Sequence, residues 1–338
     1  MLNATKTLLP KNLTARPTTM DDAEAVFELT QLHMLENFGK SNQTLEELKS
    51  EWDAPKFDVS KNTLSVYTED NKLVGYASVW DTREVPVRPW TWGYVHPNYR
   101  RQGIGTYLLQ WMEQRARQVI DRVPEHARVV MQADCLDTDK ANIKLFESQG
   151  MVSERSSWDM LIEMDAEPEA PVWPEGITLT SMAELDDLTA VYRAFVDSFQ
   201  DHRGHVEESE EVGLERFRHW ISTDPNYDPS LWFAAMDGDK IAALSLCQEK
   251  SWDDAESGYV NVLGVIRDYR RKGLGLAILQ HSFVEFWKRG QRKASLGVDA
   301  TSLTGATRLY EKAGMRIHYR FDFYEKELRP GEELSNQG

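Results

Sequence analysis

The sequence has few of the features that mark secreted, disulfide-rich or membrane proteins. Its 338 residues include only two cysteines, Cys135 and Cys247, which are far apart in the chain. They give neither a disulfide framework nor a C-x-x-C motif, so we expect both to be small buried residues. The chain shows no run of about twenty apolar residues that would span a bilayer and no secretory leader pattern. We therefore expect a cytoplasmic protein with no membrane partner.

Positive charge is also scarce. The chain has 39 Lys and Arg against 55 Asp and Glu, which gives a net charge of −16. Because nucleic-acid binding depends mainly on neutralising phosphates, this composition argues against a nucleic-acid partner. An acidic surface tolerates a cationic ligand, although acidic surfaces commonly serve solubility alone.

Two common nucleotide-binding motifs are missing. The chain contains no P-loop, G-x-x-x-x-G-K-[ST], and no dinucleotide fingerprint, G-x-G-x-x-G. It contains instead a segment that occurs twice, as Val-His-Pro-Asn-Tyr-Arg-Arg-Gln-Gly-Ile-Gly at 95–105 and as Val-Ile-Arg-Asp-Tyr-Arg-Arg-Lys-Gly-Leu-Gly at 265–275. Flanking segments repeat as well, namely a hairpin pattern at 66–77 and 233–243 and a helix end at 144–151 and 308–315. The chain is therefore a tandem duplication.

The repeat defines the expected domain organisation. Each half reads as a strand, two helices, three antiparallel strands, a helix, a strand, a helix and a final strand. The length allows two domains that each bury their own core. A proline-dense stretch at 167–174 indicates a stiff connection. We predict an N-terminal domain at 11–165, a linker at 166–175 and a C-terminal domain at 176–328.

The repeated turn predicts an anion site. The glycines of Arg-Arg-x-Gly-x-Gly let the backbone turn tightly and approach a ligand without side-chain obstruction. A helix follows the turn, and the free N–H groups at a helix N-terminus favour an anion. The neighbouring arginines add charge for phosphate oxygens. Each copy therefore predicts a pyrophosphate cradle.

These segments, with Leu-Tyr-Glu-Lys-Ala-Gly-Met at 309–315, resemble the acetyl-CoA-binding core of the GCN5-related N-acetyltransferase (GNAT) superfamily. The tandem arrangement is similar to that of mycothiol synthase and its two-domain relatives. The resemblance implies an α/β (α+β) protein of two GNAT folds, each with a mixed, mostly antiparallel sheet that splays between its fourth and fifth strands and is flanked by helices. It implies that acetyl-CoA is the cofactor and that backbone groups around Val95, Leu263 and Val265 pair with the pantetheine arm. The implied pyrophosphate-binding residues are Arg100, Arg101, Gln102, Gly103, Ile104, Gly105, Thr106, Arg270, Arg271, Lys272, Gly273, Leu274, Gly275 and Leu276.

One difference between the halves bears on catalysis. Tyr310 matches the family's tyrosine beside the cofactor sulfur, where a phenol can protonate the departing thiolate; otherwise it is an amphipathic-helix residue. Its counterpart in the first half is Phe146, which cannot donate a proton. The resemblance therefore implies that the second half is catalytic and the first is degenerate. The family's asparagine that often opens the last helix is replaced by Asp139 and Leu303, which puts its contact to the pantetheine in doubt.

The general base is harder to assign. Many relatives carry Glu on the fourth strand, six residues before its final Val, and this chain has Pro89 and Tyr259 there. We predict Glu256 as the base; with Asp253 and Asp254 it otherwise forms a solvated acidic turn.

Two further groups of residues are ambiguous. His202, His205 and Glu207 fit no zinc signature, so we predict no metal and consider acceptor contact or a water-borne proton path instead. Trp80, Trp90 and Trp92 either line an acceptor pocket or pack in the core.

Two functions follow from the sequence. The first is an acetyl-CoA-dependent N-acetyltransferase that acts by direct attack of a primary amine of a small molecule, with the C-terminal domain catalytic. The alternative is a non-catalytic acyl-CoA-binding, scaffolding or sensing protein. The residues do not identify the acceptor, and a monomer and a homodimer both remain open.

Overall fold

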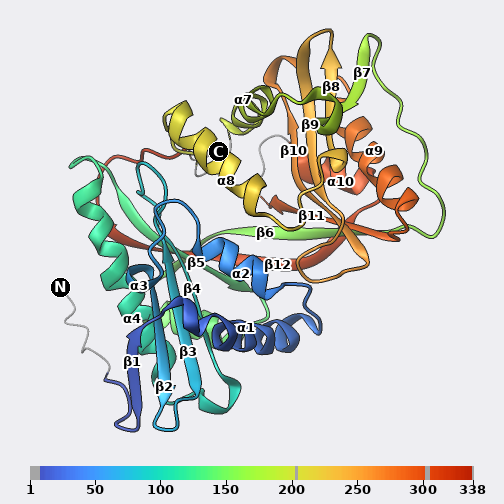
Figure 1. Cartoon of the computed structure of the whole chain (residues 1–338). Helices are drawn as coiled ribbons and strands as arrows, with labels where there is room; N and C mark the ends of the chain where they lie inside the picture. Colours follow the sequence, from blue (N-terminus) through green and yellow to red (C-terminus); the bar gives the residue numbers. More distant parts are fainter. Residues whose placement is uncertain (1–7, 202–204, 301–304, 337–338) are drawn as a thin grey trace. The chain divides into compact units, whose positions relative to one another are not determined.

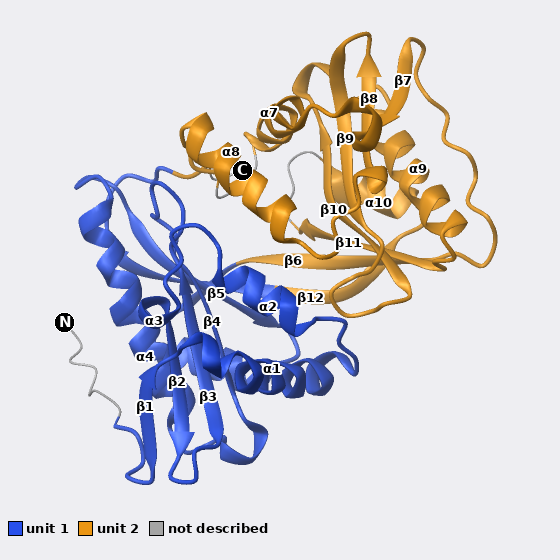
Figure 2. Cartoon of the chain, in the orientation of Figure 1, with its two compact units in different colours: residues 1–154, 322–334 blue, residues 155–321, 335–338 orange. Residues whose placement is uncertain are grey.

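The computed structural model of the protein describes residues 8–201, 205–300 and 305–336 (Figure 1). The chain forms two compact units, drawn in different colours in Figure 2. The first unit contains the chain up to Glu154 and residues 322–334, and the second contains residues 155–321 and the last few residues. Each unit is a mixed sheet flanked by helices, so the predicted fold class is confirmed.

The first unit orders its strands β1-β2-β3-β4-β5-β12. The first four strands pair antiparallel, and β4 and β5 pair in parallel. The strands are β1 (Leu13–Pro17), β2 (Thr63–Thr68), β3 (Leu73–Trp80), β4 (Trp90–Val95), β5 (Val129–Leu136) and the end of β12 (Arg316–Arg329).

Helices cover both faces of this sheet (Figure 1). On one face α1 and α2 pack on a cluster that includes Tyr67 and Tyr76. On the other face α4 lies so close to β3 that a side chain on Gly75 would come within 2.9 Å of Ile104. The helices are α1 (Ala23–Phe38), α2 (Leu45–Trp52), α3 (Val59–Asn62), α4 (Ile104–Ala116) and α5 (Lys140–Ser148).

The second unit repeats the plan, with the strand order β6-β11-β10-β9-β8-β7. Here β10 and β11 are the parallel pair. The strands are β6 (Val152–Glu163), β7 (Ile177–Ser181), β8 (Trp232–Asp237), β9 (Lys240–Gln248), β10 (Ser257–Val265) and β11 (Lys293–Asp299).

Two buried clusters fill the second unit, one on each face of its sheet. Residues of α9 and α10 pack on one face, with Met160, Leu296 and Tyr310 among them. Residues of α7 and α8 pack on the opposite face, against Val262 and neighbouring strands. The helices are α6 (Met182–Leu185), α7 (Leu188–Phe199), α8 (Glu210–Thr223), α9 (Leu274–Lys288) and α10 (Ala306–Lys312).

The two repeats exchange their last strands. β6 closes the first repeat in sequence, yet residues 157–163 pair antiparallel with β11 of the second unit. β12 closes the second repeat, yet its residues from 322 onward belong to the first unit. There Glu325 accepts hydrogen bonds from Arg88 (2.5 Å) and Gln132 (2.9 Å). The compact units therefore do not follow the continuous segments 11–165 and 176–328, because strand pairing crosses the repeats.

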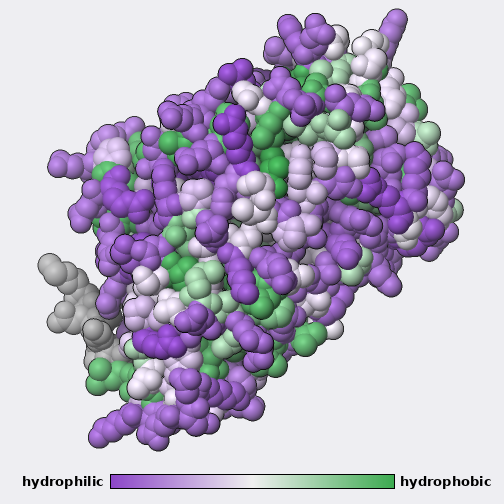
Figure 3. Space-filling model, in the orientation of Figure 1, coloured by the Kyte–Doolittle hydropathy of each residue, from purple (hydrophilic) through white to green (hydrophobic). Residues whose placement is uncertain are grey.

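Both cysteines are buried, as the sequence predicted. Burial raises the pKa of the Cys135 thiol to about 12 and that of the Cys247 thiol to about 11. Hydrophilic residues dominate the face drawn in Figure 3, where hydrophobic patches are small and scattered. Within the described residues, no helix has the length and apolar character that crossing a bilayer requires.

Candidate active site

Both repeated turns have the same backbone conformation. Arg101 and Arg271 have positive φ values of 63° and 67°, and Gly103 and Gly273 follow with 85° and 87°. The two glycines are the N-caps of α4 and α9. The first helical hydrogen bonds come from Tyr107 and Ala277, so the N–H groups of residues 104–106 and 274–276 precede them. Each turn therefore presents free N–H donors at a helix N-terminus, as a pyrophosphate cradle requires.

The two arginines of each cradle differ in their surroundings. Arg100 forms a bidentate pair with Glu36, and its Nε donates to the Val95 carbonyl (3.4 Å). Arg270 contacts Asp201 (2.7 Å) and the Val265 carbonyl (3.1 Å).

The second arginine of each cradle, Arg101 or Arg271, is exposed, and so are Gln102 and Lys272 beside them. Arg100 thus ties the strand end to Glu36 of α1, and Arg270 ties it to α7 by donating to the Ser198 carbonyl (3.1 Å). The second arginine of each cradle faces outward.

The second glycine of each motif permits close helix packing. A Cβ on Gly105 would lie 3.2 Å from Leu145 Cδ2, and one on Gly275 would lie 2.9 Å from Leu309 Cδ1. Leu145 and Leu309 belong to α5 and α10, so these helices adjoin the cradles. The next residue along each helix is Phe146 or Tyr310. The structure thus brings the cradle residues and Tyr310 to the same end of the second unit.

The parallel strands in each unit separate toward the cradle. β4 pairs with β5 only at Trp90, opposite Gln132. β10 pairs with β11 through Ser257, Gly258 and Tyr259 only. Among the described residues, strand pairing ends at these points: residues 91–95 and 260–265, which include Val95, Leu263 and Val265, have no register partner in β5 or β11, although the Thr91 hydroxyl donates to the Gln132 carbonyl of β5 (2.8 Å). This is the expected splay. We call the point where the two strands separate the vertex: Trp90 and Gln132 mark it in the first unit, and Tyr259 and Ser295 mark it in the second.

The strand that leads into the cradle differs between the units. β4 keeps a continuous register with β3 from Trp90 to Val95. In β10 the register with β9 shifts between Val260 and Val262, so Asn261 forms a β-bulge. A bulge leaves a residue unpaired and redirects its backbone groups. The second unit therefore has a redirected backbone segment near its vertex.

Tyr310 and Phe146 are both buried, each with 7% exposure. Within the described residues the Tyr310 hydroxyl makes no hydrogen bond, and burial raises its pKa to about 12. It is therefore protonated at neutral pH. Phe146 packs against Tyr324, with ring centroids 5.3 Å apart.

Glu256 lies apart from this arrangement. It is exposed in the turn before β10, where its N–H donates to Asp254 Oδ1 (3.0 Å). Asp254 also pairs with Lys293 (3.1 Å). Asp253 is buried and accepts a hydrogen bond from the Ser251 hydroxyl (2.5 Å). Ser257 and Gly258 separate Glu256 from Tyr259 along the chain, and the role of Glu256 as the base stays a prediction.

Other polar groups do lie at the vertex of the second unit. Tyr259 is the last residue of β10 that pairs with β11, and its partner is Ser295. The Ser295 hydroxyl is buried and has no hydrogen-bond partner among the described residues. A Cβ on Gly297 would lie 3.6 Å from the Tyr259 hydroxyl, and Gly297 is the register partner of buried Asp159 on β6. Sequence reasoning missed Asp159, because β6 comes from the other repeat.

Aromatic rings occupy the corresponding face of the first unit. Trp80 stacks on Phe57 (4.3 Å between centroids) and on Trp92 (5.6 Å), and Trp90 meets Phe323 edge-on (5.2 Å). These three tryptophans therefore pack with other rings. The first vertex also has buried polar groups, because Gln132, the register partner of Trp90, donates to the Glu325 carboxylate of β12 (2.9 Å).

Other predicted residues have structural roles or lie outside the described part. Asp139 caps α5 by accepting from the N–H groups of Ala141 and Asn142. His202 and Leu303 lie outside the described residues. No group of three or more His, Cys, Asp or Glu within the described ranges has a metal-binding arrangement.

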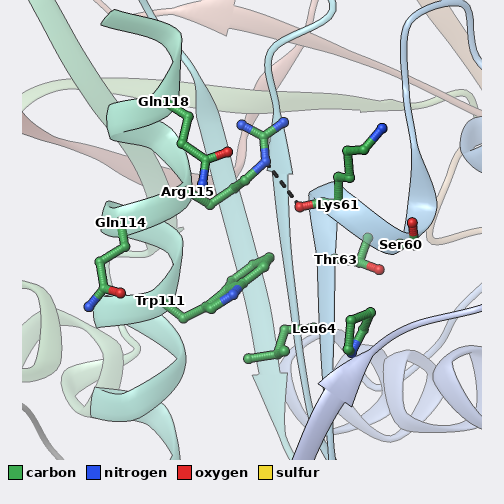
Figure 4. A pocket seen from close by; sticks show the side chains of 9 residues that line it. Ser60, Lys61, Thr63, Leu64, Trp111, Gln114, Arg115 and Gln118 are labelled. Carbon is green, nitrogen blue, oxygen red and sulfur yellow. Dashed lines mark hydrogen bonds between the residues drawn. The ribbon is translucent and has the colours of Figure 1, made fainter.

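A cavity of about 260 Å³ lies on the first unit, near the end of α4 that is remote from the cradle (Figure 4). Trp111 and Arg115 line it from α4, and Lys61 lines it from α3. Arg115 donates to the Lys61 carbonyl (3.0 Å), as the dashed line shows. This cavity belongs to neither cradle.

Comparison with known proteins agrees with this geometry. The sequence pattern of the acetyltransferase (GNAT) family matches residues 25–151 and 188–315, once in each repeat. The chain therefore contains two GNAT repeats. The chain is 27% identical to a mycothiol acetyltransferase from Thermobispora bispora over 65% of this chain and 70% of that protein.

Solved structures extend the likeness to the whole chain. A GCN5-related N-acetyltransferase from Sphaerobacter thermophilus is 33% identical, with a TM-score of 0.78 over 97% of this chain and 99% of that one. A tandem GNAT protein from the clavulanic acid biosynthesis pathway shares the fold, with 16% identity, a TM-score of 0.69 and coverage of 95% and 100%. The chain belongs to the acetyltransferase (GNAT) family and is an acyl-CoA-dependent N-acetyltransferase.

Proposed function

We propose that the protein transfers an acetyl group from acetyl-CoA to a primary amine of a small molecule, and that the second unit performs the reaction. Tyr310 carries this assignment, because it offers a protonated hydroxyl beside the cradle where the first unit has Phe146. The bulge at Asn261 supports it. The mycothiol acetyltransferase relatives support an amine acceptor.

The proposed chemistry assigns a task to each part of the site. The cradle at residues 270–276 holds the pyrophosphate, and the open edge of β10 pairs with the pantetheine arm like an added strand. A backbone N–H redirected by the bulge stabilises the oxyanion as the amine attacks the thioester carbonyl. The C–S bond then breaks, and Tyr310 protonates the thiolate.

We propose a binding or structural role for the first unit. Its cradle has the same backbone as the second, which supports coenzyme binding. It lacks both the phenol at position 146 and a bulge in β4. These differences support the prediction that the first domain is catalytically degenerate.

Thiol release from acetyl-CoA across a panel of primary amines tests the proposal. The native chain should release coenzyme A with at least one amine and form the matching N-acetyl product, detected by mass spectrometry. Coenzyme binding in calorimetry without turnover on any amine would instead support the scaffolding or sensing function.

A further inference from the structure

The second unit lacks the Glu that many relatives carry on the fourth strand but has another carboxylate close by. Position 259 carries Tyr, and its ring reaches over Gly297 of β11, where a Cβ would lie only 3.6 Å from the hydroxyl. Gly297 pairs with Asp159 of β6. Antiparallel partners have Cα atoms about 4.5–5.5 Å apart and side chains on the same face. The Tyr259 hydroxyl therefore lies within about one strand spacing of the Asp159 carboxylate.

Alternation along the strands places this pair on the acceptor side. Met160 faces the cluster beneath α9 and α10, so Asp159 faces the opposite side. Ser295 and Gly297 share that face because Leu296 points toward α9 and α10. It is the face on which α7 and α8 pack. The Tyr259 hydroxyl, the Asp159 carboxylate and Gly297 therefore lie on the face of the sheet opposite Tyr310.

A buried hydroxyl marks the same point. Ser295 is 3% exposed, and its Oγ has no hydrogen-bond partner among the described residues. An unsatisfied buried hydroxyl costs free energy, and a polar ligand at the vertex would satisfy it. Its pairing with Tyr259 puts this hydroxyl where β10 and β11 separate.

We propose that Asp159 is the proton acceptor for the attacking amine of the second unit, acting through the Tyr259 hydroxyl; this rests on the proposed function. The ammonium group of the acceptor gives one proton to the Tyr259 oxygen while the phenol gives its own proton to Asp159. The neutral amine attacks the thioester carbon, the C–N bond forms and the C–S bond breaks. The nitrogen loses its second proton to solvent as the amide forms, and Tyr310, having protonated the thiolate, regains a proton from solvent. The net proton released is the one that Asp159 accepts and later returns to solvent.

The electrostatics around the pair agree with this role. Burial raises the pKa of Tyr259, and the charges of Asp159 and Asp253 raise it further, so the phenol stays protonated and relays a proton without ionising. Other charged or titratable groups on this side include Tyr319 of β12, Lys293 and Asp299 of β11, and Arg155 and Glu163 of β6. The strand exchange thus gives the second site a carboxylate encoded by the first repeat.

The test compares Asp159→Asn and Tyr259→Phe with the native chain, using the amine that turns over best. Each variant should lose about a hundredfold in kcat, with little change in acetyl-CoA affinity. The double variant should lose no more than about the larger single loss, because the two groups act as one unit. Glu163→Gln is the matched control: it lies on the same strand and face, is exposed and removes one negative charge. It should keep native turnover.

The basicity of the acceptor amine shows whether Asp159 removes a proton or has only a structural role. The Asp159→Asn loss should be largest for strongly basic amines and should shrink for weakly basic ones, which are neutral before they bind. A loss independent of amine basicity, or native turnover in Asp159→Asn, would overturn the inference. A larger loss in Glu256→Gln than in Asp159→Asn would also overturn it and favour the exposed turn. If the native chain acetylates no amine, the proposed function itself fails.

Discussion

β4 runs into the first cradle as a regular strand, whereas β10 runs into the second with a bulge at Asn261. The helix beside the first cradle presents Phe146, and the helix beside the second presents Tyr310. The turns themselves match within a few degrees at both positive-φ positions. Duplication has therefore preserved the backbone conformation of the two turns while the neighbouring strand and helix residues have diverged.

The largest expected difference between the units concerns the cradles. Gly273→Val puts a β-branched residue at a φ of 87°, which costs about 1–3 kcal/mol, and its side chain obstructs the anion. Nothing lies within 4 Å of a Cβ at this position, so the fold should survive. Coenzyme affinity at this site should fall about a hundredfold, and turnover should fall with it. Calorimetry should still detect the site at Gly103, and two intact sites in the variant would contradict the account.

The next effect concerns the phenol. Tyr310→Phe should lower kcat about a hundredfold with little change in coenzyme affinity, because a general acid acts in the transition state. Since the pKa of Tyr310 is raised to about 12 by burial, the acid is available throughout the neutral range. The defect should shrink as the pH rises, unless amine deprotonation limits the rate. Phe146→Tyr should add no activity, since β4 has no bulge; a gain would mean that the phenol alone distinguishes the units.

Some of the features compared here can be predicted from the sequence, and others require the structure. The cradles follow from local glycine and arginine spacing, and the splay follows from the resemblance. The strand exchange could not be predicted, because the alternation within β6 and β12 is the same whichever neighbour they pair with. The Asn261 bulge depends on a one-residue register shift that periodicity does not reveal. The placement of Asp159 follows from the exchange, so it too required the structure.

A smaller effect concerns packing behind the cradles. A Cβ on Gly275 would lie 2.9 Å from Leu309, against 3.2 Å from Leu145 for Gly105. Overpacking costs about 1–3 kcal/mol, and replacing a helical glycine by alanine returns up to about 1 kcal/mol. Gly275→Ala should lower the free energy of unfolding by about 1 kcal/mol, and Gly105→Ala should be close to neutral. Urea unfolding of both variants measures the two changes in the free energy of unfolding. Equal changes would show that α5 and α10 move by the same amount to accommodate the added methyl group.

A further effect of similar size concerns acid stability. Asp22 in the first unit accepts hydrogen bonds from Arg16 (2.7 Å) and Tyr67 (2.6 Å). The Arg16 guanidinium first, and then Tyr67, hold the pKa of Asp22 well below its usual range. A depressed pKa gives stability that is present above the unfolded-state value of about 3.9 and is lost as the pH falls through the folded value.

Asp22→Asn should therefore lower the free energy of unfolding by about 1–2 kcal/mol near neutral pH, and this loss should shrink below about pH 4. The matched control is Asp187→Asn in the second unit. Asp187 caps α7 by accepting from the Ala190 N–H (2.9 Å), and Asn caps about as well, so this variant should change little at any pH. Urea titrations at pH 7 and pH 3 measure both. A loss in Asp22→Asn that does not vary with pH would exclude the ionic contribution.

Disabling the first site completely is the most direct test of the claim that the second unit performs the chemistry. The double variant Gly103→Val/Phe146→Ala removes the φ-dependent turn of the first cradle and the ring beside it, and leaves residues 259–276 and Tyr310 unchanged. The measurement is kcat for acetyl transfer at saturating acetyl-CoA. The account predicts a kcat close to that of the native chain. Loss of transfer in this variant, with transfer retained in Gly273→Val, would contradict it and assign catalysis to the first unit.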